Sequence, residues 1–166
     1  VNFTNVRNYL ALVGPECKEL DGILGYYGEQ LMLLAQSLGL NSCWVGGTYK
    51  VVNRAYNVDL GQKLAAVIAL GYGITQGVPH RSKAPQAVVP GYDGAPEWFK
   101  RGVDAALLAP TALNQQKFSF SLDGEVGDVP VVRASTRRGA FAQMDLGIAQ
   151  CHFEIGAGPA LYRWAE

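Results

Sequence analysis

The stretch GYYGEQLMLLAQSLGLNSCWVGGTY, residues 25–49, decides most of what the sequence predicts about the fold. From Leu20 to Leu38 apolar residues recur at steps of three and four, which is the spacing of an amphipathic helix. The residues of this stripe are Leu24, Tyr27, Leu31, Leu34 and Leu38. Gly39 follows where a helix end needs a left-handed residue, and residues 42–45 then predict a strand that ends at a pair of glycines. The stretch therefore predicts a long helix followed directly by a strand.

This helix also carries apolar residues away from its main stripe. Met32 and Leu33 add apolar surface on another side of the helix. A helix with apolar surface on two sides has to bury both of them. We therefore expect a core helix that also lies in an interface between subunits or subdomains.

Shorter signals outside this stretch predict the remaining elements. Short apolar runs bounded by glycine or proline are typical of buried strands, and alternation with period two is typical of a half-exposed strand. The sequence predicts strands at 9–13, 64–70, 118–122 and 129–133, helices at 96–107 and 144–155, and a loop at 77–96. The resulting order, β-α-β-β-α-β-β-α, lacks regular βαβ alternation and so favours an α+β fold over a doubly wound sheet.

The composition limits the class of protein. The 166 residues fit one domain, and 49% of them are hydrophobic, which excludes a disordered chain. The 14 Lys and Arg residues balance the 14 Asp and Glu residues, and zero net charge argues against nucleic-acid binding and against an electrostatic membrane anchor. The longest uncharged run, between Glu29 and Lys50, is broken by polar residues and predicts no membrane span. Because charged residues are only 17% of the chain, we expect a partner or a cofactor to cover part of the surface.

Cysteine and histidine usage predicts neither disulfides nor a metal site. The three cysteines have no metal-type spacing, and a sparse, odd number indicates a reducing compartment, hence the cytoplasm. His80 and His152 have no second ligand at zinc spacing. Cys43, within an apolar strand, is expected to be an inert buried thiol. No signal peptide is visible, and because the chain opens with Val1 and not Met we expect a segment upstream of it.

Two segments have the chemistry to bind a planar cofactor that carries a phosphate. Trp44 to Gly47 would place an aromatic wall at a strand end, followed by two residues whose backbone can approach a flat ring closely. The alternative for this segment is an ordinary turn. Arg81 and Lys83 place two cations on one loop, which can bind a phosphate, and the alternative is a solvated charge pair.

A third segment, APTALNQQKF at residues 109–118, joins a helix to a strand through several carboxamides. An amide offers a donor and an acceptor together, which suits the edge of a pyrimidine-like ring. The alternative is that Asn114 and Gln116 satisfy the backbone of their own loop.

Together these segments resemble the FMN-dependent nitroreductases, and most closely the branch in which one chain carries both halves of the usual dimer. The resemblance spans nearly the whole chain. The pieces that carry it are GYYGEQLMLLAQSLGLNSCWVGGTY (25–49), VIALGYG (67–73), HRSKAP (80–85), EWFKRGVDAALLAPTALNQQKFSF (97–120) and DLGIAQCHFEIGAG (145–158).

The resemblance implies a fold and a set of cofactor-binding positions. The fold is an α+β, nitroreductase-like α/β/α sandwich with a mixed, mainly antiparallel sheet flanked by helices. In the family, the segment that matches Trp44 to Gly47 lies along the flavin ring, and a pair of cations binds the FMN phosphate. The carboxamide segment reaches the flavin from the other subunit. The matching positions are Trp44, Val45, Gly46, Gly47, Arg81, Lys83, Pro110, Thr111 and Asn114.

The function implied by the resemblance is that of an FMN-dependent NAD(P)H oxidoreductase. Such an enzyme passes hydride from NAD(P)H through the flavin to nitroaromatic or quinone-type acceptors by a ping-pong mechanism. The chain is then a single domain over 1–166, with an FMN-holding lobe at 1–90 and a partner-like lobe at 91–166, either a monomeric pseudo-dimer or a homodimer. No side chain is identified as an acid or a base. The alternatives are a non-catalytic flavin-binding protein with the same fold and an interaction module with an empty cleft.

The chain departs from the family pattern in two places. Family members begin with an Arg-x-Ser-x-Arg stretch that binds the phosphate and ribityl groups, and this chain has no counterpart before Tyr9. The stretch from Arg133 to Arg137 has that spacing, but in a different part of the chain. Lys117 and Phe118 replace the Pro-Trp pair that is common after the family's Asn-x-Gln.

Overall fold

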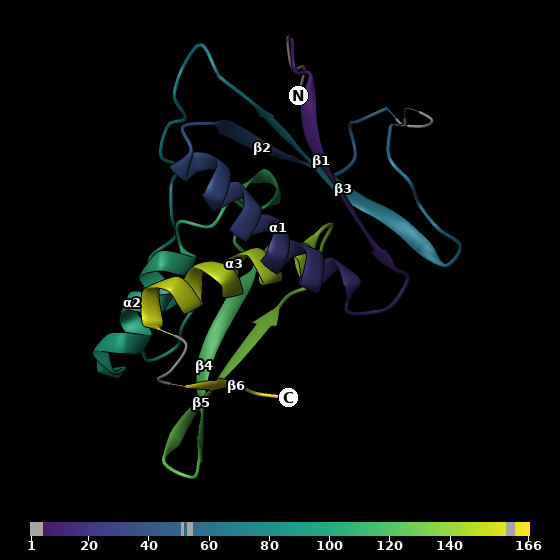
Figure 1. Ribbon diagram of the computed structural model, residues 1–166. Helices are drawn as coiled ribbons and strands as arrows, with labels where there is room; N and C mark the ends of the chain where they lie inside the picture. Colours follow the sequence, from purple (N-terminus) through teal and green to yellow (C-terminus); the bar gives the residue numbers. More distant parts are fainter. Residues whose placement is uncertain (1–4, 51, 53–54, 159–161) are drawn as a thin grey trace.

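Two small sheets lie on either side of a pair of crossing helices in the computed structural model (Figure 1). The structure describes residues 5–50, 52, 55–158 and 162–166. The strands are β1 (Asn8–Pro15), β2 (Asn41–Val45), β3 (Gln62–Gly71), β4 (Phe118–Val126), β5 (Val129–Thr136) and β6 (Arg163–Trp164). The α-helices are α1 (Leu20–Ser37), α2 (Glu97–Ala106) and α3 (Ala142–Ala157), and the 3₁₀ turns are η1 (Pro85–Ala87), η2 (Tyr92–Gly94) and η3 (Ala112–Asn114).

The strands form two three-stranded sheets. In the first, with order β1-β3-β2, both pairings are antiparallel. In the second, with order β4-β5-β6, the β4–β5 hairpin is antiparallel and β6 runs parallel to β5. The hairpin turns through Gly127 and Asp128, both with positive φ, as a two-residue turn between twisted strands requires. The α+β class is confirmed, with α1 and α3 placed between the two sheets.

Glycine residues let the backbones of α1 and α3 come into direct contact. A Cβ added to Gly25 would overlap the carbonyl of Met144, and one added to Gly147 would overlap the carbonyl of Gly22. Both obstacles are backbone atoms, which no rotamer change can move. The small residues on the facing sides of the two helices therefore make this close approach possible.

The buried side of α1 differs from the predicted one. Its buried residues are Leu20, Gly25, Gly28, Glu29 and Ala35. Of the predicted stripe, Leu24 packs against the core, whereas Tyr27, Leu31, Leu34 and Leu38 are exposed. The close approach of α3 selects the face with small residues for burial, and the large apolar residues remain outside. Met32, from the other predicted apolar side, packs against the core. The prediction that the helix also lies in an interface between subunits or subdomains stays a prediction.

One hydrophobic core runs through both halves of the chain. Leu12 and Ile68 from the first sheet belong to the same buried cluster as Phe120 and Phe153 from the second half. Tyr162 and Trp164 complete an aromatic group around Phe153, with ring centroids 5.4 and 5.5 Å from it. The two-lobe division at residue 90 stays a prediction.

The remaining elements agree with the sequence except where they are very short. β6 was not predicted, because two residues carry no periodic pattern and its position depends on the aromatic group around it. The predicted loop 77–96 contains η1 and η2, and between them Val88 and Val89 are buried, with the Val88 carbonyl accepting the N–H of Phe120. In the described part of the chain, no helix combines the length and apolar character that crossing a membrane requires.

The three cysteines differ in burial and therefore in expected reactivity. Cys17 is exposed, Cys43 is half-buried and Cys151 is buried. Burial raises the pKa of Cys151 to about 11, helped by the charges of Glu29 and Glu154, and burial also raises the pKa of Cys43. Because the thiolate is the reactive form, iodoacetamide at pH 8 should alkylate Cys17 first and Cys151 only after unfolding. Mass spectrometry of timed samples tests this order, and equal labelling rates for Cys17 and Cys151 would contradict it.

Candidate functional site

The end of β2 lies against an aromatic ring from the start of α3. Gly46 and Gly47 follow directly after β2. A Cβ added to Gly46 would lie 2.6 Å from the ring atoms Cε1 and Cζ of Phe141, so only glycine allows this contact. Phe141 itself is 39% exposed. An aromatic ring can therefore rest directly on this backbone.

Strained backbone is concentrated in the same region. Six non-glycine residues among those described have positive φ, and four of them are Leu113, Asn114, Gln116 and Phe141. For a residue as bulky as Phe141, with φ of 60°, this conformation costs roughly 1–2 kcal/mol. Such strain persists only where the surroundings impose it, and it is typical of functional sites.

The side chain of Trp44 does not form the predicted aromatic wall. Its indole Nε1 donates to Glu29 Oε2 at 2.9 Å, and its ring packs against Gly28 of α1. In the strand register Trp44 lies opposite Ile68, a residue of the main core, so alternation turns Trp44 toward α1 and Val45 to the other face of the sheet. Phe141 is the aromatic residue at this position, and no local pattern of residues predicts it.

A buried carboxylate holds Trp44 in place. Glu29 is only 1% exposed, and its second oxygen, Oε1, lies 2.8 Å from His152 Nε2 on α3. Glu29 thus joins α1, β2 and α3 through two side-chain contacts. His152, which has no second ligand at zinc spacing in the sequence, thus contacts the Glu29 carboxylate.

The loops that carry Arg81 and Asn114 are joined by a buried glutamine. Gln116 is 2% exposed; its Oε1 accepts the N–H of Lys83 at 2.9 Å, and its Nε2 donates to the carbonyl of Arg81 at 3.0 Å. Asn114 donates to the same Arg81 carbonyl at 2.9 Å and accepts from Gln116 Nε2 at 2.6 Å. Of the two interpretations, the structure shows the one in which Asn114 and Gln116 satisfy loop backbone.

Lys83 joins the same two loops and is not a solvated cation. Its Nζ donates to the carbonyl oxygens of Gln115 at 2.8 Å and Gln116 at 2.7 Å. Burial lowers the pKa of Lys83, and the positive charges of Arg137 and Lys117 lower it further. The residue is half-buried, whereas Arg81 is exposed. Of the predicted pair, Lys83 therefore holds the two loops together, and Arg81 is a cation on the surface.

Asp145, in the first turn of α3, fixes the carboxamide segment. Its carboxylate accepts the N–H of Ala112 at 2.9 Å and Nε2 of Gln115 at 2.8 Å. Thr111, which follows the half-buried Pro110, accepts the N–H of Gln116 at 3.0 Å through its hydroxyl. These contacts bring the predicted positions at 110–114 to the start of α3, where Phe141 meets Gly46.

The buried carboxyl group of Asp145 predicts that the free energy of unfolding depends on pH. Burial raises the pKa of Asp145, against the hydrogen bonds from Ala112 and Gln115 and the charge of Lys117, which lower it. The folded state then holds this proton to higher pH than the unfolded state does, so its contribution to stability falls as pH rises from about 4.

We therefore expect the difference in free energy of unfolding between the wild type and Asp145→Asn to decrease from about pH 4 upward. Urea titrations at several pH values measure this difference. Glu97→Gln, which removes an exposed carboxyl group at the start of α2, serves as the control. A difference for Asp145→Asn that grows with pH would contradict the assignment.

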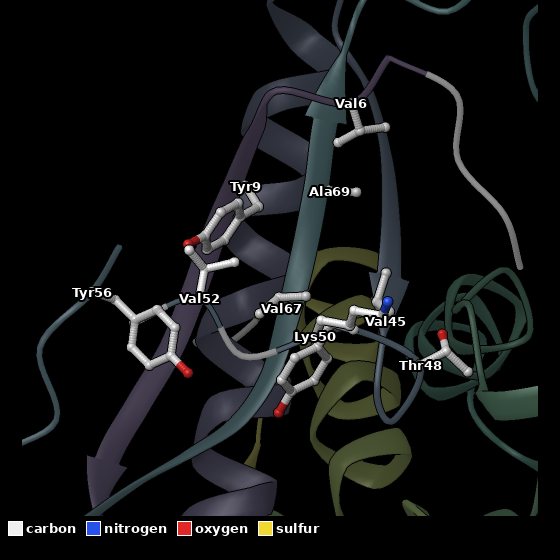
Figure 2. Close-up of a pocket in the computed structure, with 10 residues that line it drawn as sticks. Val6, Tyr9, Val45, Thr48, Lys50, Val52, Tyr56, Val67 and Ala69 are labelled. Atoms are coloured by element: carbon white, nitrogen blue, oxygen red, sulfur yellow. The ribbon is translucent and has the colours of Figure 1, made fainter. Parts of the chain in front are cut away.

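A cavity lies beside the site, on the sheet face that points away from α1 (Figure 2). It has a volume of about 170 Å³ and is mainly apolar. Its lining residues are Val6, Tyr9, Val45, Thr48, Tyr49, Lys50, Val52, Tyr56, Val67 and Ala69. Of the predicted site residues only Val45 lines it, so the candidate site is an adjacent surface and not this cavity.

Comparisons with known proteins agree with this fold. The crystal structure of a "putative nitroreductase" from Thermotoga maritima matches with a TM-score of 0.65 at 21% sequence identity. The match covers 89% of this chain and 59% of that chain, so this chain spans less than two thirds of that protein's length. A comparison with curated proteins gives no match. Residues 1–157 match the model of the family described as "Putative TM nitroreductase". The chain therefore belongs to this nitroreductase family.

Proposed function

We propose that the chain is an FMN-dependent NAD(P)H oxidoreductase that reduces nitroaromatic or quinone-type acceptors. The observation that carries the proposal is the convergence of three segments at the start of α3. The contact of Gly46 with Phe141 brings in residues 44–47, Gln116 brings in residues 81–83, and Asp145 brings in residues 110–115. Membership of the nitroreductase family supports the same function.

The residues at this junction fit a planar cofactor with a phosphate. The backbone of Gly46 already accommodates an aromatic ring, and Gly47 has open space around its Cβ position, where the nearest atom is Phe141 Cζ at 3.8 Å. Exposed Arg81 and half-buried Lys117 lie on the loops that Gln116 and Lys83 tie together. Gly46 and Gly47 would hold the ring edge with backbone N–H groups, and the cations would hold the phosphate.

Bound FMN would supply hydride transfer between NAD(P)H and the acceptor, which would use the site in turn. The contributions of this chain are placement and charge. Asp145 and Gln116 fix the loops, because their side chains are committed to hydrogen bonds between segments. Lys83 and Lys117 give the site a positive potential, which favours negative charge there.

The second candidate is a flavin-binding protein without turnover. One observation favours it: the side chains of Asn114 and Lys83 are engaged within the loops. This observation does not remove the backbone and the cations that would contact a flavin.

Anaerobic absorbance spectroscopy distinguishes these candidates. The purified protein is incubated with FMN, freed of unbound flavin and mixed with NADH or NADPH. Retention of flavin with rapid bleaching near 450 nm is the result expected for the enzyme. Retention without bleaching by either nucleotide would favour the binding protein. Failure to retain flavin would overturn both.

A further inference from the structure

The apolar cavity beside the candidate site has a floor that belongs to the first sheet (Figure 2). Val45 of β2 and Val67 and Ala69 of β3 line it, and all three are buried. The register places Val45 directly opposite Val67, so their side chains are neighbours on the same face of the sheet. These three residues, the apolar floor, are therefore held in place by strand pairing.

Three tyrosines stand around the apolar floor. Tyr9 comes from β1, and Tyr49 and Tyr56 come from the segment that follows β2. Tyr49 and Tyr56 are half-buried; burial raises the pKa of Tyr49, and the nearby Tyr56 raises it further. The Tyr49 phenol therefore stays uncharged and keeps its proton for donation. Each tyrosine offers an apolar ring and a hydroxyl group, which suits a flat ring that carries a polar substituent.

The size of the cavity limits the ligand to a single ring. Its volume is about 170 Å³. An engineered apolar cavity of about 150 Å³ in another protein binds benzene. One six-membered ring therefore fits here, whereas the three fused rings of a flavin do not. The cavity is thus distinct from the candidate flavin site, with which it shares only Val45.

Lys50 gives the cavity its charge. It is the one charged residue among the described residues that line the cavity, and none of the ion pairs in the described part of the chain includes it. Lys50 is exposed, and a lysine at the edge of an apolar cavity covers the wall with its methylene groups while its ammonium group stays in water. Because the described lining has no carboxylate to compensate it, this ammonium group favours a ligand with negative charge.

We propose that this cavity binds a monocyclic aromatic carboxylate such as benzoate. The ring lies on the apolar floor between the tyrosines, where it leaves water, and the carboxylate contacts the ammonium group of Lys50. This site goes beyond the proposed function and does not depend on it, because its ligand is not a flavin and its test contains no flavin.

The first test separates the charge of the ligand from its ring. Benzoate and the neutral benzyl alcohol are titrated by calorimetry into the wild type, Lys50→Gln and Lys63→Gln. Benzoate should bind the wild type with a Kd of about 1 mM, as a ligand of its size permits. Lys50→Gln should weaken benzoate binding about fivefold and leave benzyl alcohol binding unchanged, because only the contact between charges is lost.

Lys63→Gln is the matched control, since Lys63 also lies on the first sheet but pairs with Asp21 of α1 at 3.6 Å and does not line the cavity. Its benzoate affinity should equal that of the wild type. Three results would each overturn the proposal: no benzoate binding to the wild type, equal losses in the two lysine variants, or equal losses of benzoate and benzyl alcohol in Lys50→Gln.

A second measurement locates the ring. Amide shifts caused by benzoate should centre on Tyr49, Lys50, Val67 and Ala69, and Val67→Phe, whose own ring fills the cavity, should abolish binding of both ligands. Circular dichroism confirms that this variant is folded. Shifts centred elsewhere, or full binding to folded Val67→Phe, would overturn the proposal. So would sedimentation showing that a second copy of the chain covers the cavity and excludes benzoate.

Discussion

Replacing Gly147 by alanine should lower the free energy of unfolding by about 3 kcal/mol, the upper part of the range for overpacked cores. The added methyl group would overlap the Gly22 carbonyl and would approach the Tyr26 nitrogen to 2.8 Å. Both atoms are helix backbone, so the two helices have to separate to make room. For a chain of this length the loss corresponds to a fall in Tm of about 10 °C, measured by circular dichroism.

Gly22→Ala is the matched control on the facing helix. The nearest atom to its added Cβ is the Gln143 carbonyl oxygen at 3.7 Å, which is an ordinary contact. Since alanine is the better helix former, this variant should be as stable as the wild type or more stable, by up to about 1 kcal/mol. Similar Tm values for the two variants would contradict the close packing of α1 on α3.

Replacing Glu29 by alanine should be about as damaging, with a loss of about 3 kcal/mol or more. The change leaves the indole N–H of Trp44 and the Nε2 of His152 without the acceptor that joins them. It also leaves a cavity between α1, β2 and α3, because the side chain is almost fully buried. Chemical denaturation followed by tryptophan fluorescence measures the loss.

Two further variants identify the cause of that loss. Glu97→Ala removes an exposed carboxylate paired with Lys100 at 3.1 Å, and it should cost no more than about 1 kcal/mol. Glu29→Gln keeps the volume and an acceptor for Trp44, so its loss should fall between the other two. If Glu29→Ala costs no more than Glu97→Ala, the buried network contributes no stability.

Long or strongly patterned elements could be predicted from the sequence. The helix at 20–38 has apolar residues at helical spacing along its whole length, and the strand at 64–70 is an unbroken apolar run. The structure has both, as α1 and β3. The face that α1 buries could not be predicted. Its choice depends on backbone contact with α3 at Gly25, and a pattern of large apolar residues contains no information about such contact.

The segments of the candidate site could be predicted, but the roles of their side chains could not. The direction of Trp44 depends on strand register, and the engagement of Asn114 depends on the position of Arg81, which lies in a different loop. Phe141 meets Gly46 only because α3 begins beside the end of β2. Such relations are tertiary and leave no local spacing in the sequence.

Under the proposed function, FMN binds at the junction of β2, the 81–83 loop and the start of α3. Amide chemical-shift mapping by NMR with added FMN tests this placement. The shifted amides should be those of Gly46, Gly47 and residues 81–83, 111–117 and 139–142. Shifts confined to the lining of the neighbouring cavity, such as Tyr49 and Val67, or no shifts at saturating FMN, would contradict it.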